Sequence, residues 1–91
     1  MTPVESEKVE TIFSYTGKNE TVCLSGDFNG WSDKSHCLKR QGENWEIRIL
    51  LPPGRYRYAF VLDGERWVPD SRAALQEDDG FGTINSILIV E

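Results

Sequence analysis

The feature that most restricts the fold of this chain is a two-residue alternation of apolar and polar side chains. Residues 45–51 carry an apolar side chain at every second position, and residues 55–62 repeat the pattern. Successive side chains of a β-strand point to opposite faces, so this period is typical of strands with one buried face. An amphipathic helix would instead show a period of about 3.6 residues. These segments are therefore predicted to be strands.

Short segments of this kind, separated by Gly- and Pro-containing turns, account for most of the chain. The predicted strands are residues 9–16, 20–25, 37–40, 45–51, 55–62, 67–68 and 84–90. Residues 71–82 are the one long predicted loop, with a helical turn expected at 72–76. About seven short strands joined by such turns predict an all-β fold, an immunoglobulin-like antiparallel β-sandwich. Its predicted core contains Val22, Leu24, Trp45, Ile47, Ile49, Tyr58, Phe60 and Leu62.

The length of the chain sets its domain organisation. Its 91 residues suffice for one domain and are too few for two of normal size. We expect residues 1–8 to be a disordered segment and residues 9–91 to form a single β-sandwich. The polar, acidic start is not a signal peptide, and no apolar stretch approaches the roughly 18 residues of a membrane span. These observations predict a cytoplasmic protein that does not interact with membranes.

The charge and the cysteine content argue against nucleic-acid binding and against a structural metal site. The net charge is −5, and the ten basic residues are scattered, whereas nucleic-acid binders cluster Lys and Arg. No nucleic-acid partner is therefore expected. Cys23, Cys37 and the single histidine, His36, fall short of the four ligands of a structural zinc site. We expect no metal site and two free thiols in a reducing compartment, with no disulfide between them.

Side chains suited to catalysis do not form a recognisable constellation. His36 and Cys37 are adjacent, and adjacent side chains of an extended chain point opposite ways. The fifteen carboxylates could in principle supply the pair that a glycosidase uses, but that pair needs a deep cleft, for which a sandwich of this size has little room. The acidic run at 77–79 is interpreted as solvated surface, because it lacks the spaced oxygen ligands of a calcium loop. We expect no enzymatic activity, no catalytic residue and no cofactor.

Two tryptophans stand in unusually polar surroundings. Trp31 follows a Gly-Asp-Phe-Asn-Gly loop and precedes Ser32 and Asp33, while Trp67 follows Glu65 and Arg66. A sugar presents apolar C–H faces and a polar rim, so its binding sites combine flat aromatic rings with amide groups. The alternative, that either ring belongs to the core of a small sandwich, stays open at this point.

Four collinear motifs resemble those of one known family. Residues 22–32, Val-Cys-Leu-Ser-Gly-Asp-Phe-Asn-Gly-Trp-Ser, resemble the opening signature of the isoamylase N-terminal-like glycogen-binding modules. Residues 51–60 resemble the family's Leu-Pro-x-Gly-x-x-x-Tyr-x-Phe region, and residues 63–70 its Asp-Gly-x-Trp-x-x-Asp segment with one extra residue. Residues 82–86 resemble its Gly-Thr-x-Asn-Asn/Ser close. The group includes a domain of the AMP-activated protein kinase β subunit and modules of branching and debranching enzymes.

The resemblance implies a carbohydrate site made of specific residues. It assigns sugar stacking to Trp31 and Trp67, and it places Phe81 where the kinase module inserts a Leu between glucose units. It places Thr83 and Asn85 at the positions that bind the hydroxyl groups of the sugar. The kinase module's Lys donor is replaced by Ala59, and Arg57, on the same outward face, is expected to compensate in part. Phe28 and Asn29 are interpreted as loop packing and turn formation.

The resemblance therefore implies non-catalytic binding of an α-glucan such as glycogen, starch or a malto-oligosaccharide. One alternative is a protein-interaction sandwich of the same ancestry, which would keep the fold and lose the sugar platform. Another is an accessory domain of an amylase-type glycoside hydrolase or branching enzyme, whose catalytic barrel would need about 250 further residues. A glucan-metabolising enzyme or a kinase acting in trans is the expected protein partner.

Overall fold

The computed structural model describes residues 8–91, and most of them lie in nine strands. The strands are β1 (Val9–Thr16), β2 (Val22–Gly26), β3 (His36–Cys37), β4 (Lys39–Gln41), β5 (Asn44–Leu51), β6 (Gly54–Leu62), β7 (Arg66–Val68), β8 (Leu75–Asp78) and β9 (Ile84–Val90). A single turn of 3-10 helix, η2 (Asp27–Asn29), follows β2. No helix in this part of the chain is long and apolar enough to cross a membrane. Apart from Lys8, the predicted disordered segment lies outside the described residues.

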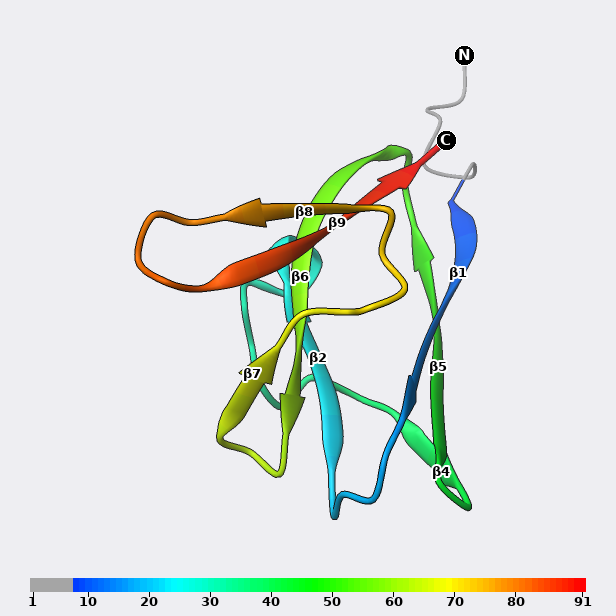
Figure 1. Cartoon of the computed structure of the whole chain (residues 1–91). Coiled ribbons are helices and arrows are strands. Elements are labelled where there is room, and N and C mark those ends of the chain that lie inside the picture. Colours follow the sequence, from blue (N-terminus) through cyan, green and yellow to red (C-terminus); the bar gives the residue numbers. More distant parts are fainter. Residues whose placement is uncertain (1–7) are drawn as a thin grey trace.

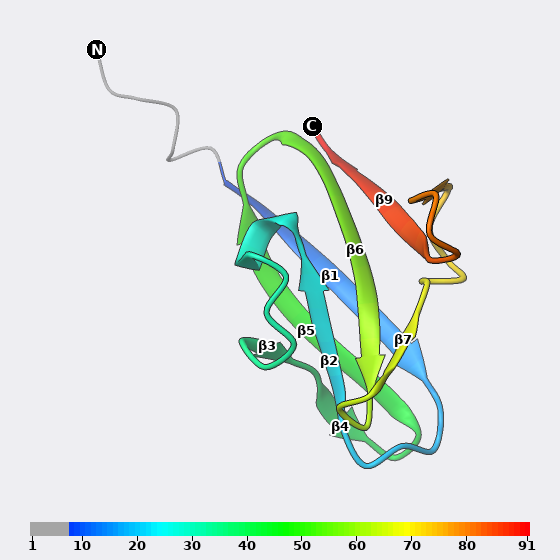
Figure 2. The same cartoon turned by 90° about the vertical axis from the view of Figure 1, so that its left-hand side faces the viewer.

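The strands form two antiparallel sheets that face each other (Figure 1). The smaller sheet has the order β1-β5-β4, and the larger has the order β3-β2-β6-β9-β8, with β7 also paired to β6. In Figure 2, β2 and β6 of the larger sheet lie in front of β1 and β5. The predicted antiparallel β-sandwich is confirmed. Its strands number nine in the described residues, against about seven expected, because β3 and β8 were not predicted as separate strands.

The core lies between the sheets and follows the predicted alternation. Of the eight residues predicted to form it, six are at most 4% exposed, while Ile47 and Ile49 are partly buried against the others. Phe13, Leu38, Leu51 and Val90 complete the cluster. Complete burial of one such side chain contributes about 1.5–3 kcal/mol. The indole of Trp45 keeps its polar atom satisfied by donating to the Gly17 carbonyl oxygen at 3.0 Å.

The prediction of one long loop at residues 71–82 is wrong, because this segment contains strand β8. Strand β8 pairs with β9 over four residues, from Leu75 opposite Ile87 to Asp78 opposite Ile84. The sequence Leu-Gln-Glu-Asp shows no alternation, so local pattern does not indicate a strand here. Pairing with a neighbouring strand decides the conformation instead. The helical turn expected at 72–76 is absent from this segment.

A buried polar cluster fixes β9 against β6. The Tyr58 hydroxyl donates to Asp70 Oδ2 at 2.7 Å, and the Asp70 backbone N–H donates to Ser86 Oγ at 2.7 Å. Burial and the neighbouring Asp70 carboxylate both raise the pKa of Tyr58 far above its ordinary value. Because Tyr58 lies on β6 and Ser86 on β9, the cluster holds the start of β9 in register.

The prediction of two free thiols is wrong, because Cys23 and Cys37 form a disulfide. Cys23 on β2 lies directly opposite Cys37 on β3, so the register brings both side chains to one face. The two cysteines are fourteen positions apart in sequence, with η2 between them, so the sequence gives no local sign of this pairing. Stable disulfides are rare in reducing compartments, so one ground for the cytoplasmic location is removed. The location itself stays a prediction.

Candidate functional site

Three segments that are distant in sequence lie on the outward side of the larger sheet. In Figure 1 the connection from η2 to β3, strand β7 and the turn between β8 and β9 all lie to the left of β6. Figure 2 turns this side toward the viewer. The predicted sugar-stacking residues Trp31, Trp67 and Phe81 come from these three segments. The fold therefore gathers their backbones on one side of the molecule.

Trp31 and Trp67 lie next to each other. Their ring centroids are 6.5 Å apart and their planes are tilted by 32°. Trp67 is 44% exposed and Trp31 is partly exposed, so neither ring belongs to the core. The structure thus excludes the alternative that these tryptophans are core residues. It leaves a pair of aromatic faces at the surface.

The backbone of Trp31 adopts the left-handed conformation, which is unusual for a bulky side chain. Its φ is 61°, and the preceding Gly30 has a φ of 65°. A non-glycine residue in this region costs about 1–2 kcal/mol, and such strain persists only where the surroundings enforce it. The Trp31 backbone N–H donates to the Gly26 carbonyl oxygen at 2.9 Å. Residues that hold a strained conformation of this kind are frequently functional.

The carboxylate of Asp27 holds both Trp31 and Arg57. The Trp31 indole Nε1 donates to Asp27 Oδ1 at 3.1 Å, and the Arg57 backbone N–H donates to Asp27 Oδ2 at 2.9 Å. The Arg57 guanidinium adds a contact from Nε at 3.3 Å. Burial alone would raise the pKa of Asp27, but these hydrogen bonds outweigh it and hold the pKa below its ordinary value. Asp27 is therefore a charged acceptor at neutral pH.

The loop that carries these residues needs glycine at one position. A Cβ atom on Gly26 would lie 2.5 Å from the Arg57 carbonyl oxygen and 2.8 Å from the Tyr58 Cβ. The Asn29 side chain then closes the turn, accepting from the Gly26 N–H at 3.1 Å and donating to the Leu24 carbonyl oxygen at 2.9 Å. Phe28 packs partly buried against the core. The interpretation of Phe28 and Asn29 as loop packing and turn formation is confirmed.

Arg57 is held between two carboxylates. Besides its contacts to Asp27, its Nη1 lies 3.9 Å from Glu77 Oε1, and Arg55 Nη2 lies 3.0 Å from Glu77 Oε2. Arg57, which was expected to compensate in part for the missing Lys donor, is thus already paired with two carboxylates. Ala59 itself is only 1% exposed, beside Ser25 on the neighbouring strand. A sugar contact by Arg57 stays a prediction, and its observed contacts give it a bracing role.

Phe81 projects from the turn between β8 and β9. Its side chain is 91% exposed, and the glycines on either side of it, Gly80 and Gly82, both have positive φ values. Asp79 Oδ1 accepts hydrogen bonds from the backbone N–H groups of Phe81 at 2.7 Å and Thr83 at 3.2 Å. The acidic run at 77–79 is therefore not merely solvated surface. Its carboxylates shape this turn and brace Arg55 and Arg57.

Thr83 and Asn85 lie on the same hairpin as Phe81. Thr83 is exposed at the end of the turn, where its carbonyl oxygen accepts from the Asp79 N–H at 3.0 Å. Asn85 is partly exposed on β9 and faces Glu77 across the strand pair. Glu77 contacts Arg57, which contacts Asp27, so the hairpin is connected to the Trp31 loop through charged groups. Sugar binding by Thr83 and Asn85 stays a prediction.

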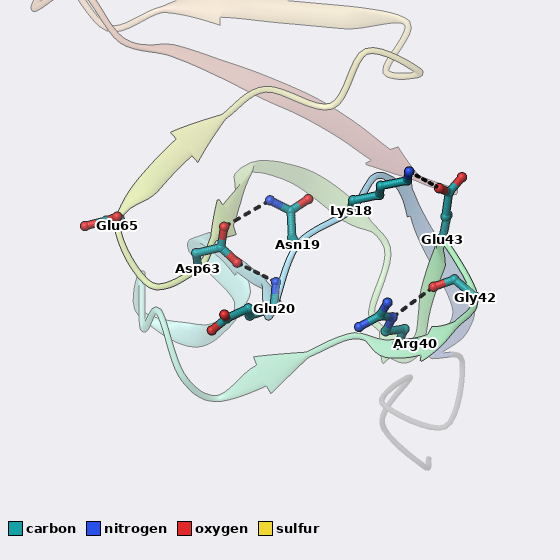
Figure 3. A pocket seen from close by; sticks show the side chains of 8 residues that line it. All are labelled: Lys18, Asn19, Glu20, Arg40, Gly42, Glu43, Asp63 and Glu65. Atoms are coloured by element: carbon teal, nitrogen blue, oxygen red, sulfur yellow. Dashed lines mark hydrogen bonds and ion pairs between the residues drawn. The ribbon is translucent and has the colours of Figure 1, made fainter.

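A polar depression in the described residues contains none of the predicted sugar-binding residues (Figure 3). It has a volume of about 770 Å³ and is lined by polar and charged side chains together with Gly42. Asp63 lies at its edge and accepts from the backbone N–H groups of Glu20 at 2.7 Å and Thr21 at 3.2 Å. Asp63 and Gly64 lie in the turn between β6 and β7. Asp63 thereby ties this hairpin, which precedes Trp67, to the start of β2.

The residues weighed for catalysis have structural contacts instead. Cys37 is in the disulfide, and His36 Nδ1 lies 3.0 Å from the Asn29 amide nitrogen. Among residues 8–91, no three His, Cys, Asp or Glu side chains are grouped so as to hold a metal ion.

Comparison with known proteins shows the family of this chain. The family described as "Glycogen recognition site of AMP-activated protein kinase" matches residues 9–91. The chain belongs to this family. The match confirms the resemblance seen in the motifs and the prediction of a carbohydrate-binding module. It also spans the whole of the predicted β-sandwich domain.

Sequence relatives agree with this membership, and a solved structure shares the fold. The chain is 36% identical over 81 residues to the 5'-AMP-activated protein kinase subunit beta-1 of Sus scrofa, covering 89% of this chain and 63% of that protein. The Homo sapiens subunit has the same identity, with 28% of its length covered. A crystal structure of maltogenic amylase from S. marinus superposes with a TM-score of 0.70 at 18% identity, covering 92% of this chain and 14% of that one. This last likeness shows the fold alone.

Three carboxylates that hold the loops of this surface were not predicted from the sequence as site residues. Asp27, Asp63 and Asp79 each accept two or more hydrogen bonds from backbone or indole N–H groups. For Asp63 and Asp79 the available signal was an Asp beside or near Gly, which favours turn-forming side-chain contacts. Asp27 also stands beside a glycine, but its contact with the Arg57 backbone N–H has no local signal, because the two residues are thirty positions apart.

Proposed function

We propose that this domain binds α-glucan chains without cleaving them, through the surface that carries Trp31, Trp67 and Phe81. The observation that carries the proposal is the pair of exposed rings of Trp31 and Trp67, 6.5 Å apart. Family membership supports glycogen or a related glucan as the ligand. The rings would cover the apolar faces of glucose units, and Thr83 and Asn85 would bind hydroxyl groups at the rim.

The expected affinity is low. Each aromatic ring that covers a glucose face contributes on the order of 1–3 kcal/mol, and each hydrogen bond adds about 1 kcal/mol. Association entropy opposes these terms. The dissociation constant is therefore expected between roughly micromolar and millimolar. Because Ala59 replaces the family's Lys donor and Arg57 is engaged by carboxylates, we expect a value near the weak end.

A titration with a malto-oligosaccharide of seven glucose units tests the proposal. We expect saturable changes in tryptophan fluorescence or amide chemical shifts in the wild type, and none in Trp67→Ala at the same concentrations. Leu50→Ala is the matched control, because Leu50 is a large exposed apolar residue on the other sheet. A wild type that does not respond to millimolar sugar would favour the protein-interaction alternative. Analysis of the sugar after long incubation should find no cleavage products.

The whole protein's partners are a separate part of the proposal. The relatives named above are subunits of protein kinases, and this chain spans less than two thirds of their length. We propose that the domain brings a kinase or a glucan-metabolising enzyme to the polysaccharide. Recovery of one of these activities with the natural protein on glycogen, and its loss with Trp67→Ala, is the expected result. Equal recovery with both proteins would contradict it.

A further inference from the structure

We infer that Asp27 is a positioning residue for sugar binding, acting through Trp31. The inference rests on the proposed α-glucan function and adds a residue to it that touches no sugar. Asp27 Oδ1 accepts from the Trp31 indole at 3.1 Å, while Oδ2 accepts from the Arg57 backbone at 2.9 Å. The carboxylate therefore connects the ring that stacks on sugar to the central strand β6.

The conformation of Trp31 explains why such a connection is needed. Its backbone is left-handed, with a φ of 61°, so relaxation of this strained loop would change the placement of the ring beside Trp67. Two hydrogen bonds oppose that relaxation, one from the backbone N–H to the Gly26 carbonyl oxygen and one from the indole to Asp27. Only the second acts on the ring itself. Asp27 thus sets the ring orientation before sugar arrives, which reduces the ordering that binding requires.

Asp27 is itself held firmly enough to act in this way. Its carboxylate is fixed by the Arg57 backbone, which belongs to β6 and does not depend on a flexible side chain. The close approach of the two segments relies on Gly26, where a Cβ would meet the Arg57 carbonyl oxygen at 2.5 Å. The Arg57 guanidinium continues to Glu77 on β8. Removal of the Asp27 carboxylate should therefore disturb Trp31 directly. It should disturb the hairpin that carries Phe81 only indirectly, through Arg57 and Glu77.

The critical substitution is Asp27→Asn, which keeps the size of the side chain and removes its charge. An amide has only one acceptor oxygen, so its NH₂ group would face the N–H of either Trp31 or Arg57. We expect malto-oligosaccharide affinity to fall about five- to tenfold, the factor that corresponds to the net contribution of one ordinary hydrogen bond. Asp33→Asn is the control, because it removes the same charge two residues beyond Trp31. Asp33 has no hydrogen bond among the described residues.

Indole N–H signals in a ¹H–¹⁵N spectrum separate positioning from general destabilisation. The three tryptophans give three signals, and Trp45 is an internal standard because its indole donates to Gly17 in the core. In Asp27→Asn we expect the Trp31 signal to move and its hydrogen exchange to accelerate, while the Trp45 signal stays in place. A change of all three signals together would mean that the whole fold has loosened and would overturn the inference.

A second variant keeps the inference testable if Asp27→Asn fails to fold. Trp31→Phe keeps a stacking ring and removes the indole N–H. If Asp27 acts through that group, Trp31→Phe alone should weaken binding, and adding Asp27→Asn should cost clearly less than it does in the wild type. Full additivity, or unchanged affinity in Asp27→Asn, would overturn the inference and leave the proposed function standing. A wild type that binds no sugar would overturn the proposed function, whatever the indole signals show.

Discussion

The two loops that carry aromatic residues to the outward surface are held in different ways. The Trp31 loop, residues 27–36, is fixed to distant strands by Asp27 and by the disulfide between Cys23 and Cys37. Within residues 8–91, the hydrogen bonds that hold the turn at residues 79–83 come from its own neighbours, such as those to Asp79. Trp31 is partly buried beside Trp67, whereas Phe81 is 91% exposed.

This difference indicates two contributions to one binding surface. A ring that is already in place adds contact area without an ordering cost. A ring on an exposed turn must be ordered when the ligand arrives, at about 0.5–1.5 kcal/mol for a mobile side chain. The Trp31 and Trp67 pair should therefore supply most of the affinity. Phe81 should adjust to the ligand and contribute less than its contact area suggests.

Removal of the disulfide is the strongest test of the Trp31 loop. We expect Cys23→Ala with Cys37→Ala to lower the free energy of unfolding by about 3 kcal/mol, because the bond closes the segment between two residues that are fourteen positions apart. Malto-oligosaccharide affinity should fall as well, since Trp31 lies inside that segment. Urea denaturation and sugar titration measure the two effects. Reduction of the wild type with dithiothreitol should reproduce both, and an unchanged denaturation midpoint after reduction would contradict the prediction.

Gly26→Ala tests whether the same loop depends on its close contact with β6. The new Cβ would lie 2.5 Å from the Arg57 carbonyl oxygen, and overpacking of this kind costs about 1–3 kcal/mol. We expect lower stability and a displaced Trp31 indole signal. Gly54→Ala is the matched control, because its Cβ would have only ordinary contacts of at least 3.5 Å, with Tyr56. Equal losses in both variants would show that the contact at position 26 has no special importance.

Phe81→Ala tests the other loop and should separate affinity from stability. The side chain is almost fully exposed, so the free energy of unfolding should change by less than about 0.5 kcal/mol. Sugar affinity should fall a few fold, by less than in Trp67→Ala. Phe81→Leu should restore most of the loss if the contact is apolar packing. A loss in Phe81→Ala as large as in Trp67→Ala would end the distinction between the two loops.

The sequence was sufficient to predict most of the strands and the two tryptophans at the surface. The reason for the strands is physical. Burial of one strand face imposes a period of two, which identified the strands around Trp45 and Phe60 without knowledge of their partners. The Asp63-Gly64 turn is likewise a local signal. The bracing of the Trp31 loop was not predictable in this way. Cys23 with Cys37 and Asp27 with Arg57 depend on the register of separate strands.

Strand β8 was missed for the same reason. Its four residues have no alternation of their own, and pairing with β9 alone makes them a strand. Glu77, which was interpreted as solvated surface, acquires its role through that pairing, which brings it within reach of Arg55 and Arg57. Local pattern thus predicts which faces are buried. It does not predict which polar groups meet across the sheet.

Asp63 offers the mildest test, because it supports the hairpin that precedes Trp67 and neither of the two loops. Hydrogen bonds from the Asn19 side chain and from the backbone of Thr21 and Glu20 hold the pKa of Asp63 below its ordinary value. A depressed pKa in the folded state means that the stabilisation is fully present above the unfolded-state pKa, about 3.9. It is lost as the pH falls through the folded-state pKa. Stability should therefore decline in acid, and Asp63→Asn should flatten that decline.

The measurement is urea denaturation of the wild type and Asp63→Asn between neutral pH and about pH 3, a range that brackets the unfolded-state pKa of an aspartate. At neutral pH Asp63→Asn should be slightly less stable, and the two proteins should converge as the pH falls. Asp33→Asn is the control for loss of one carboxylate charge near the Trp31 loop. Because Asp27 also has a depressed pKa, Asp63→Asn should keep part of the slope. Parallel curves for the wild type and Asp63→Asn would show that the Asp63 hydrogen bonds contribute nothing to the folded state, and that the hairpin before Trp67 is held by strand pairing alone.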